Sequence, residues 1–136
     1  MFPESKGVNA SVLCYAVITT DPQYHHRMSF VRLTGHDPIT EEEKEKLSLE
    51  KLVTEDTPPT FLWHTTTDAT VPVTNSLLYA KALADHNVPF SVHIYPAGAH
   101  GLATVDGQTN GALSEEARQA QEWFSAVMQW LKITMK

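Results

Sequence analysis

The sequence predicts an α/β fold in which about three parallel strands are flanked by helices on both faces. The first indication is that two short β-rich runs, Phe61 to His64 and Phe90 to Tyr95, are separated by a helical pattern. Strands that alternate with helices are typical of parallel sheets. The second indication is that Asp68 follows the first run and His100 follows the second. Catalytic groups collect at the carboxyl ends of parallel strands, so these two residues are the candidate site.

The length of the sequence indicates one domain that spans residues 1–136. A chain of this length can bury a core of its own. The formal net charge of −6 argues against nucleic acid or an anionic membrane surface as a partner. Cys14 is the single cysteine, so the fold needs no oxidising compartment. The longest apolar run, residues 12–18, is too short to span a bilayer, and the first residues lack a secretion signal, so the expected location is the cytoplasm.

The first strand is expected within Ser11 to Thr19, which is a nearly continuous apolar run with β-branched and aromatic members. Such a run is typical of a strand that is covered on both faces of a parallel sheet. Asp21-Pro22 ends it, and residues 21–57 then form a polar excursion between two core strands. Long excursions of this kind are often functional, and a surface packing element is the alternative interpretation.

Two short helices are expected in the excursion. Thr40 is a good N-cap residue, and Glu43 stands three residues later, as in a capping box. Glu41 and Glu42 add negative charge at the positive end of the helix dipole. The second helix is expected over residues 48–53, with a small apolar face made of Leu49, Leu52 and Val53.

The helix between the two later strands follows Asp68. Thr57-Pro58-Pro59 stiffens the entry to the strand that precedes it. Pro72 fits the first turn of the helix, and Asn87 fits a left-handed residue just beyond its end near His86. Apolar residues at spacings of three or four predict the face that packs on the sheet, namely Val73, Leu77, Ala80 and Ala84.

The last helix is expected to begin near Ser114, which is a good cap with two glutamates behind it. The segment before it, Thr104 to Leu113, contains two glycines and is predicted to be a flexible loop. A dense apolar stripe indicates the core-facing side of the helix, and its members are Ala120, Trp123, Phe124, Val127, Trp130 and Leu131.

Three stretches resemble the C-terminal half of the α/β-hydrolase family, and within it the small bacterial acetyl esterases and the acetylxylan or feruloyl esterase-like enzymes. These stretches are Pro58 to His64, the Asp68 loop with Val71-Pro72-Val73, and Ala97 to Leu102. The resemblance covers roughly residues 11–131. In that family the triad runs Ser, then Asp or Glu, then His, so the resemblance implies that Asp68 is the triad acid and His100 the triad base. It also implies that the excursion overhangs the active site and shapes the acyl or alcohol pocket.

The nucleophile of the family is absent from this sequence. It sits in a Gly-x-Ser-x-Gly elbow upstream of the acid, and no such pentapeptide occurs here. Ser11 opens a strand and Ser76 lies inside a helix, so neither has an elbow context. Cys14 falls within an apolar strand, where a buried and inert thiol is expected. The resemblance therefore implies an esterase fragment that carries the acid and the base but is inactive alone.

The remaining histidines do not indicate a metal site, and no cofactor is expected. His25 and His26 are adjacent, and no His-Glu-x-x-His motif or paired cysteine spacing occurs. His64 and His93 fall within strands, where packed or hydrogen-bonded core residues are expected.

Three functions of different classes remain open. The first is an ester hydrolase that acts on a small ester and receives its serine and oxyanion hole from a separate N-terminal hydrolase half. The second is a non-catalytic fold remnant that self-associates. The third is a small-ligand binding module. By the resemblance, the outer edge of the first strand is unpaired, and a bare edge strand is a template for pairing, so a homodimer is expected.

Overall fold

The computed structural model describes residues 7–136. Its elements in chain order are β1 (Ser11–Cys14), α1 (Arg27–Thr34), α2 (Glu41–Leu47), the 3-10 helix η1 (Leu49–Lys51), β2 (Thr60–Thr65), α3 (Thr74–Asp85), β3 (Phe90–Tyr95), α4 (Gly107–Asn110), α5 (Glu115–Arg118), the 3-10 helix η2 (Gln119–Gln121) and α6 (Glu122–Thr134). No helix in this part of the chain is long and apolar enough to cross a membrane.

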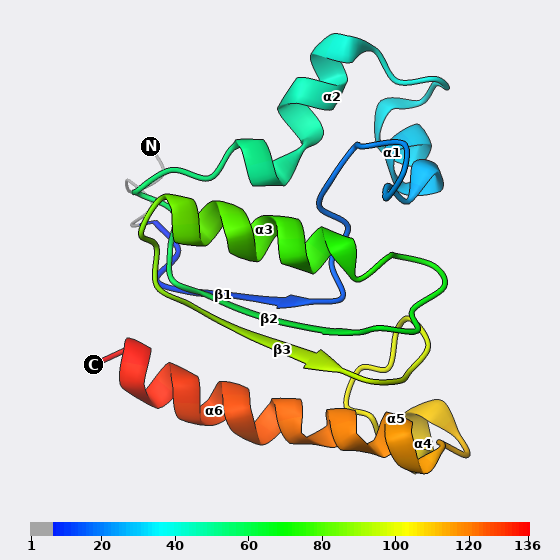
Figure 1. The fold of residues 1–136 in the computed structure, drawn as a ribbon, viewed down its shortest axis with the longest axis vertical. Helices are drawn as coiled ribbons and strands as arrows, with labels where there is room; N and C mark the ends of the chain where they lie inside the picture. Colours follow the sequence, from blue (N-terminus) through cyan, green and yellow to red (C-terminus); the bar gives the residue numbers. More distant parts are fainter. Residues whose placement is uncertain (1–6) are drawn as a thin grey trace, which may run out of the picture.

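The three strands form one parallel sheet in the order β1-β2-β3. Ser11 of β1 lies opposite Thr60 of β2, which in turn lies opposite Phe90 of β3. Helix α3 covers one face of the sheet and α6 covers the other, while α1 and α2 lie beyond α3 (Figure 1). The predicted α/β class, with parallel strands and helices on both faces, is confirmed.

The central strand β2 is buried along its whole length because both of its faces are covered. Its alternate residues belong to two separate clusters, one on each face. Phe61 and Trp63 pack in the cluster that includes α6, where the rings of Trp63 and Trp123 stack with centroids 5.1 Å apart. Leu62 packs with Leu83 of α3 in the other cluster. This buried central strand ends at Thr65, shortly before Asp68.

Local signals in the sequence predict several element ends. The capping box at Thr40 is present: its hydroxyl accepts the Glu43 N–H, and the Glu43 carboxylate accepts the Thr40 N–H at 2.7 Å. Asn87 has a φ of +56°, in the left-handed region, just after α3. Ser114 caps α5 by accepting the Ala117 N–H. These predictions are confirmed because each depends on contacts within a few residues.

The first strand is shorter than the apolar run predicts. It ends at Cys14, and Tyr15 has a φ of +40°, so the chain turns out of the sheet there. Ile18 and Thr19 are buried, but outside the sheet. Cover on both faces is also incomplete, because Val12 is 38% exposed. The apolar run therefore has two parts. Its first part forms a strand of the sheet, and its second part is buried outside the sheet.

The predicted sheet-facing side of α3 is confirmed at Ala80 but wrong at two other positions. Leu77 and Ala84 are exposed, and the buried positions are Asn75, Ser76, Ala80 and Leu83. Two of these side chains are polar, and they are buried because they are hydrogen-bonded to groups outside the helix. A count of apolar spacing cannot detect such a face.

Three smaller expectations also need correction. In the excursion only Val53 is buried, while Leu49 and Leu52 are exposed, since residues 49–51 form a single 3-10 turn. The segment predicted as a loop contains α4, whose N-terminus is capped by the Asp106 carboxylate. In the apolar stripe of the last helix, Phe124 is 53% exposed and lies edge-on to Trp123.

Candidate active site

The carboxylate of Asp68 is fixed by the backbone that follows it. Its Oδ1 atom accepts the N–H groups of Thr70 and Val71, both at 2.9 Å. The Asp68 N–H bonds back to the carbonyl of Thr65, the last residue of β2. An aspartate that accepts such bonds two and three residues ahead closes a tight turn. The side chain is thereby held at the carboxyl end of the central strand, and it is only 1% exposed.

His100 reaches the other carboxylate oxygen from the loop after β3. Its Nδ1–H donates to Asp68 Oδ2 at 2.7 Å, which is a short, charge-assisted hydrogen bond. The His100 side chain is 31% exposed, so part of the ring is open to solvent. The structure therefore joins the two residues that the sequence singles out, in the geometry by which a carboxylate fixes an imidazole tautomer.

The environment keeps Asp68 ionised. Burial alone would raise the pKa of this carboxyl, but the hydrogen bonds from Val71 N–H, His100 and Thr70 N–H outweigh it and hold the pKa below its ordinary value. The carboxylate is thus available to stabilise positive charge on the His100 ring.

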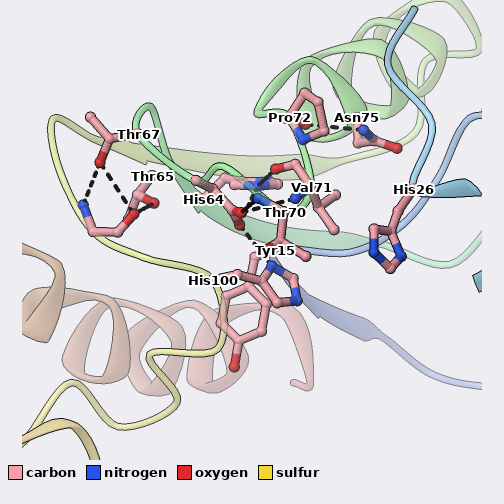
Figure 2. A network of polar contacts seen from close by, with 12 residues as sticks. Tyr15, His26, His64, Thr65, Thr67, Thr70, Val71, Pro72, Asn75 and His100 are labelled. Atoms are coloured by element: carbon pink, nitrogen blue, oxygen red, sulfur yellow. Dashed lines mark hydrogen bonds and ion pairs between the residues drawn. The ribbon is translucent and has the colours of Figure 1, made fainter. Parts of the chain in front are cut away.

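Threonines at the end of β2 hold the loop that carries His100. Thr65 Oγ1–H donates to the carbonyl of Gly98 at 2.7 Å, and the hydroxyl of Thr67 accepts the Gly98 N–H at 2.8 Å. Thr66 donates to the carbonyl of Pro96 at 2.5 Å. Figure 2 shows the Thr65 and Thr67 contacts beside the His100 site. The loop that carries Asp68 and the loop that carries His100 are therefore connected by hydrogen bonds.

Tyr15 supports His100 from the end of β1. Its ring packs edge-on against the His100 ring, with centroids 4.9 Å apart (Figure 2). It also packs edge-on against Trp63 at 5.0 Å. Its hydroxyl accepts the N–H of Ala103 at 3.2 Å. The positive φ at this residue turns the side chain toward the site, so all three strands contribute to the place where His100 lies.

A second histidine lies behind Asp68. His64 is fully buried on β2, and its Nε2 atom is 2.9 Å from the carbonyl of Val71 and 3.2 Å from Asp68 Oδ2. Its Nδ1 atom is 2.8 Å from the hydroxyl of Ser76. Burial lowers the pKa of His64, although the Val71 carbonyl and Asp68 act in the opposite direction, so the ring is neutral.

Other candidate nucleophiles and ligands stay apart from the pair. Ser76 is fully buried. Burial raises the pKa of the Cys14 thiol, although the Trp63 side chain acts in the opposite direction. His93 is half-buried and stacks on Phe61, as expected for a packed strand histidine. Among residues 7–136 no three His, Cys, Asp or Glu side chains are grouped as metal ligands.

A cavity beside the excursion does not include the pair. It has a volume of about 330 Å³ and lies between the excursion and Leu78 of α3, with Thr20 and Ser48 among its lining residues. Neither Asp68 nor His100 lines it.

Sequence reasoning finds Asp68 and His100 because each directly follows a strand. It misses the residues that position them, which are Tyr15, His64 and the three threonines 65–67. The three threonines could have been found from the sequence, because they form a run of hydroxyl residues just before Asp68. Tyr15 carried no such signal, because its role depends on a backbone turn.

Comparison with known proteins identifies the family. The profile of the prolyl oligopeptidase family matches residues 7–134. A curated relative, endo-1,4-beta-xylanase B of Butyrivibrio fibrisolvens, is 44% identical over 97 residues, which are 71% of this chain and 15% of that protein.

Solved structures with the same fold include several ester and sugar hydrolases. An acetyl ester-xyloside bifunctional hydrolase from Caldicellulosiruptor lactoaceticus is 40% identical, with a TM-score of 0.78 over 91% of this chain. A sugar hydrolase from Lactococcus lactis is 30% identical with a TM-score of 0.73, and a carboxylesterase from Lactobacillus plantarum is 29% identical with a TM-score of 0.70; each match covers 93% of this chain. The chain spans 42%, 48% and 44% of those three proteins, in the order given. The chain belongs to the prolyl oligopeptidase family, and its parallel strands and flanking helices form part of an α/β-hydrolase fold.

Proposed function

We propose that this chain supplies the acid and the base of a serine hydrolase that acts on small carboxylic esters such as acetyl esters. In this role Asp68 is the acid and His100 is the base. The His100 Nε2 atom takes the proton of a serine hydroxyl, and the Asp68 carboxylate holds the Nδ1–H tautomer and stabilises the imidazolium that forms. The expected compartment is the cytoplasm, since a fold with the single cysteine Cys14 needs no oxidising one.

One observation carries the proposal. The bond of 2.7 Å from His100 Nδ1 to the buried Asp68 carboxylate lies at the carboxyl ends of β2 and β3, where catalytic groups of parallel sheets collect. The similarity to an acetyl ester hydrolase and a carboxylesterase supports an ester as the substrate class.

The serine and the oxyanion hole come, in this proposal, from polypeptide outside the 136 residues. The sequence contains no Gly-x-Ser-x-Gly elbow, and Ser76 is buried and bonded to His64. An N-terminal hydrolase half that docks in trans on the open edge of β1 would bring these groups to His100. The N–H groups of Ser11 and Tyr15 point to β2, so the backbone groups of Val12 and Cys14, which alternate with them, face the open edge.

Hydrolysis of p-nitrophenyl acetate tests this proposal in two steps. The purified chain and its His100→Ala variant are expected to show the same background rate, because no nucleophile is present. A chimera in which residues 7–136 replace the matching part of the Caldicellulosiruptor lactoaceticus hydrolase is expected to be active.

Substitution of the histidine in the chimera completes the test. His100→Ala is expected to lower kcat by about a thousandfold or more. His36→Ala, which changes an exposed histidine of the excursion, serves as the matched control and should leave kcat unchanged. An isolated chain whose activity is abolished by His100→Ala, or a folded chimera that is indifferent to it, would refute the proposal.

The open edge of β1 also favours a second candidate, in which two copies of the chain pair as a homodimer without catalysis. Val12 is partly exposed there, and an uncovered edge strand is a template for another chain. Sedimentation velocity at micromolar concentration is expected to show a dimer that Val12→Lys dissociates. A monomer at that concentration rules the homodimer out and leaves the edge to a different hydrolase half.

A further inference from the structure

We propose that His64 is a positioning residue, which holds the Asp68 carboxylate from behind so that Oδ2 stays directed at His100. The inference rests on the proposed function, since Asp68 is a triad acid only if that function is correct. Its evidence is that the Nε2 atom of His64 lies 3.2 Å from Oδ2, the carboxylate oxygen that accepts the hydrogen bond from His100.

The contacts around His64 define which of its nitrogens carries the proton. Nε2 faces two acceptors, the Val71 carbonyl at 2.9 Å and Asp68 Oδ2 at 3.2 Å. Neither of these groups can donate, so a neutral ring must carry its proton on Nε2. Nδ1 is then an acceptor, and the Ser76 hydroxyl at 2.8 Å donates to it. The Ser76 contact and the Val71 contact therefore select the same tautomer.

The result is that donors face both oxygens of the Asp68 carboxylate. Oδ1 accepts two backbone N–H groups, from Thr70 and Val71. Oδ2 accepts His100 at 2.7 Å and faces the Nε2–H of His64 at 3.2 Å. A carboxylate held at both oxygens cannot rotate about its Cβ–Cγ bond without losing donors from both histidines or from the backbone.

Burial makes this arrangement costly to replace. The side chains of His64 and Asp68 are 0% and 1% exposed, so water does not reach the shared oxygen from the His64 side. Loss of the His64 donor leaves that side of the carboxylate without a partner, and an unmet acceptor in such a place is unfavourable. The labelled side chains of His64, Val71 and His100 are drawn together in Figure 2.

Nuclear magnetic resonance on the isolated chain tests the inference without any need for hydrolysis. The ¹⁵N shifts of His64 are expected to report a neutral ring with its proton on Nε2 near pH 7. In His64→Phe, which keeps an aromatic ring but has no donor, the titration midpoint of the Asp68 carboxyl carbon is expected to move to higher pH. In His64→Gln, whose terminal N–H₂ group replaces the Nε2 donor, the midpoint is expected to stay near that of the wild type.

A matched control separates positioning from general damage to the core. His93→Phe replaces the other strand histidine, which stacks on Phe61 and makes no contact with Asp68. It is expected to leave the Asp68 midpoint unchanged. A proton on Nδ1 of His64, or a midpoint that moves equally in folded His64→Phe and His64→Gln, would overturn the inference.

The kinetic consequence is measured in the chimera described above. His64→Phe is expected to lower kcat roughly tenfold with KM unchanged, and His64→Gln to restore it, as for the loss and return of one hydrogen bond to a charged group. If the chimera is inactive while the resonance results hold, the proposed function fails and the positioning of Asp68 by His64 stands. If the chimera is active but the midpoint does not move, the positioning role fails and the proposed function stands.

Discussion

Gly98 is the residue at which the loop carrying His100 packs most closely on β2. A Cβ atom built there would lie 2.5 Å from Leu102 Cδ1 and 2.8 Å from Thr65 Cγ2, and the residue has a φ of +150°. Thr65 cannot move away freely, because its hydroxyl donates to the Gly98 carbonyl. The absence of a side chain at this position is therefore what allows the threonines to hold the loop.

Gly98→Ala is expected to destabilise the chain by about 1–3 kcal/mol, because it forces two packed side chains to shift and strains the backbone. Urea denaturation measures the loss. Gly107→Ala is the matched control, since a Cβ at Gly107 meets nothing within 4 Å. Equal midpoints for the two variants would show that the loop accommodates a side chain and that the close packing has no energetic consequence.

At the scale of single residues, the sequence predicts that Asp68 and His100 lie together, but it does not predict the residues that position them. Asp68 and His100 are found because an acid and a base after parallel strands must lie near each other. Gly98, Tyr15 and His64 act through contacts between segments far apart in the chain, such as the 88 positions that separate Tyr15 from Ala103. No local pattern encodes such contacts.

Among the elements, α3 is tied to the excursion by one buried amide. The Oδ1 atom of Asn75 accepts the N–H groups of Ile18 and Thr19, and its Nδ2 donates to the carbonyls of Tyr24 and Pro72. The side chain is fully buried and all four of its hydrogen-bonding positions are used. The start of α3 thereby joins the turn that leaves β1 to the loop that follows Asp68.

Asn75→Ala is expected to lower the free energy of unfolding by about 3 kcal/mol or more, because it leaves buried N–H groups of the backbone without acceptors. The measurement is chemical denaturation. Gln129→Ala changes an exposed amide of α6 and is expected to stay within about 0.5 kcal/mol of the wild type. A loss below about 1 kcal/mol for the asparagine variant would mean that the excursion is not anchored through this residue.

The capping box of α2 gives a prediction that concerns a single helix. Thr40→Ala removes the acceptor for the Glu43 N–H and is expected to destabilise α2 by about 1 kcal/mol. Because α2 buries no residue, the effect should appear as faster amide exchange within residues 41–47 and not as global unfolding. Ser114→Ala, which removes the cap of α5, should leave exchange in α2 unaltered. Unchanged exchange in the Thr40 variant would contradict the role of the cap.

The elements differ in how far the sequence predicts them, for a physical reason. The Thr40 cap and the left-handed Asn87 follow from contacts within a few residues, and both are confirmed. The buried face of α3 is missed, because Asn75 and Ser76 are buried by hydrogen bonds to distant segments and not by apolar character. The first strand is shorter, at Ser11–Cys14, than predicted. Ile18 is apolar because it is buried outside the sheet, and the sequence does not distinguish this from burial in a strand.

For the whole molecule, the buried histidines predict how stability depends on pH. Burial lowers the pKa of His64 and of His93 below the ordinary value of 6.5. Below about pH 6.5 the unfolded chain therefore binds protons that the folded chain does not, so the free energy of unfolding falls as the pH falls. Asp68, whose pKa is held below 3.8, contributes stability above that pH and loses it as the pH falls through the folded value.

Denaturation at pH 7.5 and pH 5.5 measures this dependence. The wild type is expected to lose stability between the two values, by at most about 1.4 kcal/mol per pH unit for each histidine. His64→Phe should show a shallower slope, because one of the two histidines with a lowered pKa is gone. An equal slope in both proteins would mean that His64 is protonated in the folded chain and would contradict the neutral tautomer.

The similarity to hydrolases is spread over nearly the whole chain, yet it covers less than half of each structure with which it is compared. The proposed acid and base follow β2 and β3, and the edge beyond β1 is where the proposed partner pairs. The fold class and the pairing of Asp68 with His100 could be predicted from the order of the strands. A nucleophile could not be predicted, because the sequence contains no Gly-x-Ser-x-Gly elbow.

The most direct measurement of the central claim is kcat for Asp68→Asn in the chimera with p-nitrophenyl acetate. The amide keeps the shape of the side chain but can no longer stabilise the His100 imidazolium, so kcat is expected to fall by about 10⁴. Asp85→Asn, at the exposed end of α3, is the matched control and should retain the parent rate. A folded Asp68→Asn chimera with kcat within about tenfold of its parent would contradict the assignment of Asp68 and His100 as acid and base.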